Sequence, residues 1–304
     1  MSEAVDWNRG LRTLPPGQWH YLMVDGSRWQ GVERRLYDIE ETPVYANLFF
    51  GTDFASVADV GPLLIAVDQN SRILGDFVQS KAIEESGYLV SSDTALDTLA
   101  EQFRHFILAR HPLGYDLMLR FADPAVVHAL LGADGAASLS SFWGSIKAVA
   151  IPDSLKGQWI HLDAPDHQGA VEKDKVKTVE LTDPLIDQME HVDRRRLVVE
   201  QVQHIDAFFP NRSQQTPRLQ LVESLEYLCS QALSNGYTSK RALTHWANVY
   251  GYIGMPNTTD IPLHSIYRHL FERQDDPETA AYQAAVTAQE QVKDSDMEQS
   301  GSAV

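Results

Sequence analysis

Three short segments constrain the fold most, because each joins an apolar, strand-like run to an aspartate with Gly or Pro close by. They are residues 21–26 (YLMVDG), 58–67 (ADVGPLLIAV) and 117–124 (LMLRFADP). A short apolar run bounded by turn residues is typical of a buried strand, with the aspartate in a turn or at the start of a helix. The sequence therefore predicts a core of buried strands with aspartates at their ends.

Helical patterns alternate with these strands through the first half of the chain. A helix is expected from Ser92 or Asp93 to about Arg110, and further strands at 115–121 and 142–151. Asp123-Pro124 predicts a helix start, with Asp as N-cap and Pro at the first helical position. Alternation of this kind indicates a mixed α/β (α+β) domain.

The second half carries apolar stripes with helical spacing and no strand signal. One stripe consists of Val198, Val202, Ile205 and Phe209, spaced by four, three and four residues. We therefore expect an all-helical C-terminal bundle. The predicted organisation is a mixed α/β lobe at 1–162, a polar linker at 163–180, a helical bundle at 181–274 and a partly disordered acidic tail at 275–304.

The charge and cysteine content limit the classes of function. The formal net charge is −17, which argues against a nucleic-acid partner or an anionic membrane surface, since both require basic groups. The single cysteine, Cys229, falls in an apolar helical pattern and is expected in the core. With no secretory signal pattern and no long apolar stretch, the sequence predicts a cytoplasmic protein.

Known catalytic and cofactor motifs are missing from the sequence. It contains no HExxH, GxSxG, GxxxxGK[ST] or GxGxxG pattern. The histidine pairs His105/His111 and His264/His269 are six and five residues apart, which does not stack two imidazoles on one helical face. We therefore expect no metal, no cofactor and no enzymatic activity.

The strand-end aspartates allow two interpretations. In one, Asp25, Asp59 and Asp123 are ligands of a divalent cation in a metal-dependent hydrolase. The alternative, which we favour, is structural: a turn at Asp25, a turn near Asp59 and a helix cap at Asp123. Arg120, expected inside an apolar strand, then needs one of these carboxylates as its partner.

Two groups of residues are candidates for protein binding. One is the aromatic set Tyr45, Phe49, Phe50 and Phe54, because aromatic side chains are enriched at interfaces. The other is the basic triplet Arg194, Arg195 and Arg196, which would suit an acidic partner surface. Core packing for the aromatic set, and a solvated helix face for the arginines, remain the alternatives.

Several of these motifs, taken in order, resemble the adaptor domain of bacterial type VI secretion systems. They lie at residues 21–26, 43–50 (PVYANLFF), 59–62 (DVGP), 119–124 (LRFADP) and 142–144 (FWG). The resemblance covers about Trp19 to Pro152, and the helical region from Thr182 to about Phe271 is similar to that family's C-terminal part.

The resemblance implies a non-enzymatic adaptor, or chaperone. Such proteins bind a toxic effector in the donor cytoplasm and load it onto the spike protein VgrG, so two protein-binding surfaces are implied. The acidic tail is longer than the family leads us to expect. A regulatory protein-binding scaffold unrelated to secretion is the other non-enzymatic alternative.

Overall fold

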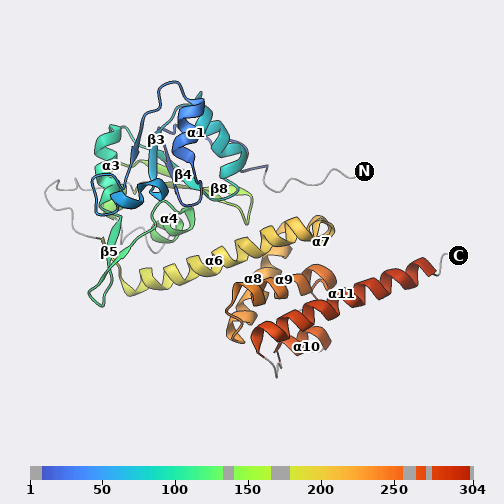
Figure 1. Cartoon of the computed structure of the whole chain (residues 1–304). Coiled ribbons are helices and arrows are strands. Elements are labelled where there is room, and N and C mark those ends of the chain that lie inside the picture. Colours follow the sequence, from blue (N-terminus) through green and yellow to red (C-terminus); the bar gives the residue numbers. More distant parts are fainter. Residues whose placement is uncertain (1–8, 133–139, 166–178, 256–264, 272–275, 302–304) are drawn as a thin grey trace. The chain divides into compact units, whose positions relative to one another are not determined.

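The chain forms two compact units (Figure 1). The computed structural model describes residues 9–132, 140–165, 179–255, 265–271 and 276–301. One unit contains Asp6–Asp193 and the other Arg194–Val304. The first is mixed and the second all-helical, which confirms the predicted fold class. The units divide inside helix α6 (Asp183–Phe208), whereas most of the expected 163–180 linker lies outside the described residues.

A six-stranded sheet forms the centre of the first unit. Its strand order is β2-β3-β1-β4-β7-β8, and every neighbouring pair is antiparallel. The bounds are Tyr21–Val24 (β1), Tyr45–Asn47 (β2), Leu63–Ala66 (β3), Gly87–Ser91 (β4), Ala148–Asp153 (β7) and Gln158–Asp163 (β8). The central strands β1, β3 and β4 coincide with apolar runs of the sequence.

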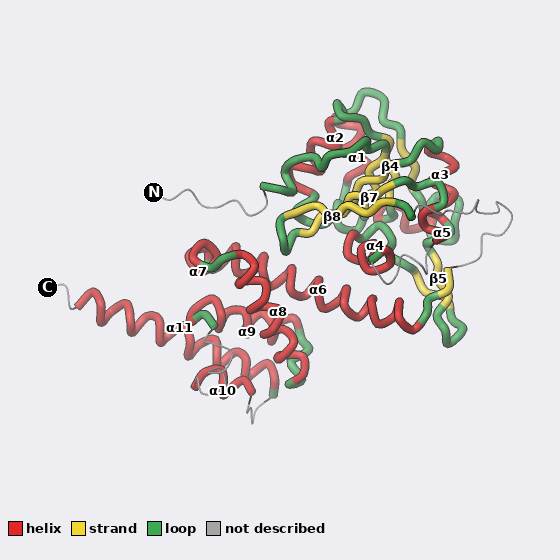
Figure 2. Tube along the Cα trace, turned by 180° about the vertical axis from the view of Figure 1, so that it is seen from behind, coloured by secondary structure: helices red, strands yellow, loops and turns green. Residues whose placement is uncertain are grey.

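Both faces of this sheet are covered by helices (Figure 2), which explains why the central strands are apolar without alternation. Leu22 and Val24 point into one core, and Met23 points into the other. The first core contains residues of α1 (Val32–Ile39), α2 (Arg72–Asp76) and the π-helical turn η2 (Phe77–Lys81). The second contains residues of α3 (Leu96–Arg104), α4 (Pro124–Leu131) and α5 (Ser140–Trp143).

The helix expected to reach Arg110 was predicted too long at both ends. It begins at Leu96 and ends at Arg104 as α3, and a small second sheet follows. Strands β5 (Leu108–Arg110) and β6 (Asp116–Met118) form a hairpin, and β9 (Val179–Glu180) pairs parallel with β5. Phe106 and Ile107 extend the helical pattern in the sequence, but they lie beyond the helix, in the turn and bend that lead into β5, and are buried from there.

The strand expected at 142–151 was wrong in its first half. Residues Ser140–Trp143 form the short helix α5, and β7 begins only at Ala148. Gln102 of α3 stabilises the turn between them: its Nε2 donates to the Phe142 carbonyl at 2.8 Å, and its Oε1 accepts from the Ser145 amide at 3.1 Å. Phe142 and Trp143 are still buried, so their apolar character gave no means of telling helix from strand.

In its described residues, the helical unit contains the part of α6 from Arg194 onward and five further helices. They are α7 (Pro210–Gln215), α8 (Arg218–Ser234), α9 (Lys240–Ile253), α10 (Ser265–Phe271) and α11 (Pro277–Gly301). Ser239 caps α9, its Oγ accepting from the Ala242 amide at 3.2 Å. Among the described residues, no helix is long and apolar enough to cross a membrane.

The region expected as an acidic tail contributes α11, which packs along α9 in the most extensive helix–helix contact among the described residues. Small residues make this packing close: Ala281 and Ala288 are fully buried, and Ala284 and Ala285 nearly so. An alanine stripe has low hydrophobicity, so the sequence pattern alone did not distinguish it from an exposed helix.

Filling the space at this contact should destabilise the helical unit. We expect Ala281→Leu to lower the free energy of unfolding by about 1–3 kcal/mol, because the larger side chain has no room between α9 and α11. The matched control is Gln283→Leu, at an exposed position on the same helix, which should change it by less than about 0.5 kcal/mol. Urea unfolding followed by circular dichroism measures both, and equal effects of the two changes would contradict the assigned packing.

Candidate protein-binding surfaces

The strand-end aspartates are held by arginines. Asp25 follows β1, and its Oδ2 lies 2.6 Å from Nη2 of Arg120. Its other oxygen accepts from the amide of Ser27 at 3.0 Å and from the Ser27 hydroxyl at 2.6 Å. The same arginine nitrogen donates to the Ser27 hydroxyl at 2.9 Å. Asp25 therefore closes the turn after β1 and ties it to the segment before α4.

Asp123 is fully buried and has two roles. As predicted, it caps α4, with Oδ1 accepting from the Ala125 amide at 2.9 Å. Its Oδ2 lies 3.4 Å from Arg28 and 3.9 Å from Arg120. Burial lowers the pKa of Arg120, but the attraction of Asp25 and Asp123 outweighs it and leaves the pKa above its ordinary value. Buried carboxylates here are neutralised by cationic side chains of the chain itself.

The predicted ion pair of Arg120 with a strand-end aspartate is confirmed, but the prediction that Arg120 lies inside a strand is wrong. It lies in the turn after β6, outside any strand, and its side chain is partly exposed. Water therefore reaches the guanidinium, and the cost of burying it is smaller than for a strand-interior arginine.

Asp59 does not take part in this ion-pair cluster. It is exposed in the 3-10 helix η1 (Ala55–Val60). Within the described ranges, no group of three or more His, Cys, Asp or Glu side chains is placed to hold a metal ion. The geometry gives the metal interpretation no support, since two of its three proposed ligands are bound to arginines.

Cys229 is buried in α8, as predicted. Burial, together with the nearby charge of Glu226, raises the pKa of its thiol to about 12. The thiolate needed for nucleophilic attack is therefore scarce at neutral pH.

The four candidate aromatic residues do not form one exposed patch. Phe49 is a core residue, and Phe54 is half-buried against it with ring centroids 5.3 Å apart. Tyr45 packs on the opposite face of the sheet and donates to Glu33 Oε1 at 2.6 Å. Burial and this hydrogen bond raise the pKa of Tyr45. Only Phe50 is exposed, at 53%.

Residues 48–61, the aromatic loop, nonetheless form a rigid segment with apolar side chains on its surface. Asn47 fixes it from both sides: Nδ2 donates to the Ala58 carbonyl at 2.7 Å, and Oδ1 accepts from the Phe49 amide at 3.1 Å. Phe50, Val57 and Val60 are the exposed large apolar side chains of this loop. Such a loop loses little conformational entropy when a partner covers it.

The β5–β6 hairpin is a second apolar surface, which the sequence interpretation missed. Four of its large apolar side chains are exposed, with Leu113 at its tip the most exposed of the four at 81%; the others are Leu108, Tyr115 and Met118. The missed signal was the turn sequence HPLG at 111–114, where Gly114 adopts a φ of 88°. Apolar side chains on both sides of such a turn are typical of a hairpin.

The basic triplet is not uniformly exposed. Arg194 is exposed on α6, whereas Arg195 and Arg196 are half-buried and interact with other groups of the chain. A dock formed by all three guanidinium groups therefore has less exposed charge than the sequence suggested.

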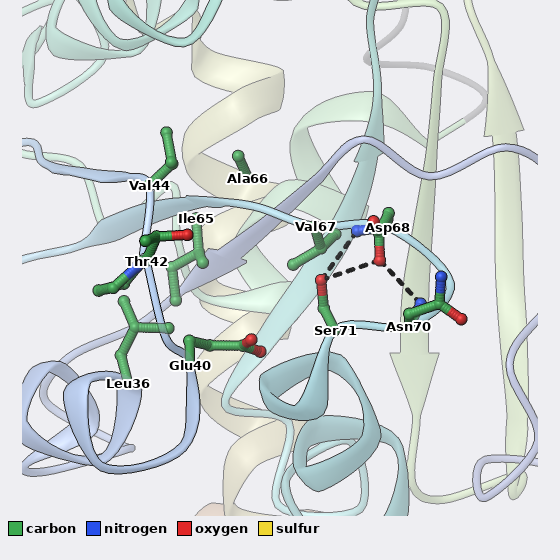
Figure 3. Close-up of a pocket in the computed structure, with 11 residues that line it drawn as sticks. Leu36, Glu40, Thr42, Val44, Ile65, Ala66, Val67, Asp68, Asn70 and Ser71 are labelled. Carbon is green, nitrogen blue, oxygen red and sulfur yellow. Dashed lines mark hydrogen bonds between the residues drawn. The ribbon is translucent and has the colours of Figure 1, made fainter.

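A shallow pocket of about 430 Å³ lies between the end of α1, the start of β2 and the loop after β3 (Figure 3). Its polar side chains are used within the protein. Asp68 Oδ1 accepts from the Asn70 amide at 2.7 Å, the Ser71 hydroxyl accepts from the Asp68 amide at 3.0 Å, and Glu40 Oε1 accepts from the Ile73 amide at 2.9 Å. These contacts stabilise the loop and the start of α2, and they do not pair a nucleophile with a base.

A comparison with models of protein families gives a match over part of the chain. Residues 20–140 match the model of a domain of unknown function, DUF4123. No curated protein and no solved structure matches the chain. The matched segment contains β1 to α4, including the Asp25–Arg120 pair, the aromatic loop and the β5–β6 hairpin.

The structural interpretation of the aspartates makes a measurable prediction. Asp123→Ala should lower the free energy of unfolding by about 1–2 kcal/mol or more, because α4 loses its cap and Arg28 loses a partner. Asp59→Ala, which removes an exposed carboxylate, should change it by less than about 0.5 kcal/mol. Chemical denaturation of both variants measures these free energies of unfolding. A large loss of stability in Asp59→Ala with none in Asp123→Ala would contradict the structural role of Asp123.

Proposed function

We propose that this chain is a non-enzymatic adaptor of a bacterial type VI secretion system. It binds a toxic effector in the donor cytoplasm and loads it onto the spike protein VgrG. The observation that carries the proposal is the match of residues 20–140 to DUF4123, because it falls on the same segment whose motifs resemble the secretion adaptors.

The chemistry of the first unit supports a binding role over a catalytic one. Asp25 and Asp123, the two buried members of the candidate metal site, are paired with arginines, and Asp123 also caps a helix. Carboxylates that are buried and already neutralised by arginines are poorly placed to bind a cation or to take a proton from a substrate. No observation favours the metal-dependent hydrolase.

Two apolar surfaces of the first unit supply what an adaptor needs. The aromatic loop presents Phe50, and the β5–β6 hairpin presents Leu113 and Tyr115. Exposed aromatic and aliphatic side chains on a rigid scaffold are typical centres of binding energy. We assign contact with a protein partner to the aromatic loop, whose backbone is fixed by Asn47 before any partner arrives.

Co-purification from the native host tests this role. Tagged full-length chain should recover a VgrG protein and a toxin encoded beside it. Recovery of neither would contradict the adaptor role. A genomic setting without spike and toxin genes would favour the regulatory scaffold instead.

A charge placed on the aromatic loop should weaken binding without unfolding the protein. We expect Phe50→Glu to reduce recovery of at least one partner about tenfold, the loss typical of an interfacial aromatic, with the free energy of unfolding changed by less than about 0.5 kcal/mol. The matched control is Val44→Glu, which adds the same charge at a site 54% exposed outside the loop, where recovery should be retained. Equal losses in both variants would show that added charge, and not the loop, affects binding.

A further inference from the structure

The two edges of the main sheet are built differently. Edge strand β2 has only three residues, Tyr45–Asn47. Pro43 precedes it at a position that points away from β3, so no donor is open there. Arg104 of α3 donates to the carbonyls of Asn47 at 3.4 Å and Leu48 at 3.3 Å. Shortness, a proline and a covering cation are the features with which proteins close a sheet edge.

Edge strand β8 has none of these features. It has six residues, QWIHLD, with no proline, glycine or lysine. Its pairing with β7 runs without a bulge from Ala148 opposite Asp163 to Asp153 opposite Gln158. A regular strand of this length at an edge is a template for another strand.

The register fixes which backbone groups of β8 are open. The Ala164 amide donates to the Lys147 carbonyl at 2.8 Å, so in antiparallel pairing Ile160 and Leu162 direct their N–H and C=O groups to β7. Those of Trp159, His161 and Asp163 point away from the sheet. No hydrogen bond from them to a backbone or side-chain group is found in the part of the chain that the structure describes.

The side chains of β8 specify what would suit this edge. Ile160 and Leu162 are half-buried against the core that contains α3 and α4. On the opposite face lie Trp159, His161 and Asp163, with the Asp163 side chain 77% exposed and 3.1 Å from His161 Nε2. A strand beside β8 therefore fits best with apolar residues beside Ile160 and Leu162 and a basic residue beside Asp163.

We propose that β8 accepts an extended segment of another polypeptide as a seventh strand of the sheet. The incoming strand has alternate apolar residues and a Lys or Arg beside Asp163. Its backbone forms hydrogen bonds with the outward-pointing N–H and C=O groups of Trp159, His161 and Asp163, and its side chains determine which segments bind. The proposal rests on the proposed function only for the identity of the natural partner, and the test uses no secretion protein.

A single outward-pointing amide provides the test. His161→Pro removes an open N–H without breaking a hydrogen bond to β7, and proline is tolerated on an edge strand. His161→Ala is the matched control, since it removes the same side chain and its contact with Trp19 but keeps the amide. The probe is a fluorescent peptide, Lys-Val-Thr-Val-Thr-Val-Thr, added to the full-length protein.

The full-length protein should bind this peptide, as measured by fluorescence anisotropy. His161→Ala should bind it within about threefold of the unchanged protein, and His161→Pro at least about fivefold more weakly, the equivalent of one backbone hydrogen bond. The peptide should slow hydrogen exchange at the amides of Trp159, His161 and Asp163. Asp163→Lys should reverse the preference, favouring the same peptide with Glu in place of Lys.

A peptide with alternate amides N-methylated gives a second readout, independent of whether His161→Pro folds. It should not bind, because it cannot form the ladder. No binding of the first peptide, or equal binding by the methylated one, would overturn the proposal. Analytical ultracentrifugation gives a third outcome that would overturn the proposal: a dimer of the unchanged protein that dissociates in the His161→Pro variant. The occupant of β8 would then be a second copy of this chain. None of these outcomes bears on recovery of VgrG or a toxin, which tests the adaptor role separately.

Discussion

Burial of the main sheet on both faces is the constraint on which the rest of the first unit depends. Leu22, Met23 and Val24 supply side chains to two different cores from one strand, so helices must cover both sides. Once α1 and α2 cover one face and α3 to α5 the other, the polar turns lie at the ends of the strands. The charged residues of those turns, Asp25, Arg28, Arg120 and Asp123, then bring distant parts of the chain together.

That electrostatic cluster explains why aspartates at strand ends do not imply chemistry here. A carboxylate with no exposure is costly unless it is paired and hydrogen-bonded. Asp123 is stabilised by a hydrogen bond from a backbone amide and by two guanidinium groups. Asp25 is stabilised by an arginine and by a serine hydroxyl. Each group that stabilises the fold in this way is withdrawn from coordination and proton transfer. On the proposed function, binding falls instead to surfaces such as the aromatic loop, where backbone contacts leave Phe50 exposed.

The sequence was informative where local chemistry decides the structure. The apolar runs of β1 and β3, the cap at Asp123 and the helical stripe of Val198, Val202 and Ile205 in α6 all follow from short-range rules. It was misleading where tertiary packing decides. Phe106 and Ile107 continue a helical pattern yet lie beyond the end of α3, and Phe142 is buried equally well from a helix as from a strand. The candidate surfaces were hardest to predict, because Phe49 and Phe50 are identical in type and adjacent, and only the path of the backbone separates core from surface.

The contrast between the closed edge at β2 and the open edge at β8 has a consequence for how the molecule behaves in a crowded solution. An open edge strand can pair with the same strand of another copy, which leads to aggregation. The net charge of −17 opposes this, because copies approaching one another repel over roughly a Debye length, about 8 Å at physiological ionic strength. The negative charge of the chain does not repel a positively charged segment of another protein. If β8 accepts a strand as proposed, the net charge therefore favours a cationic segment of another protein over a second copy of this chain.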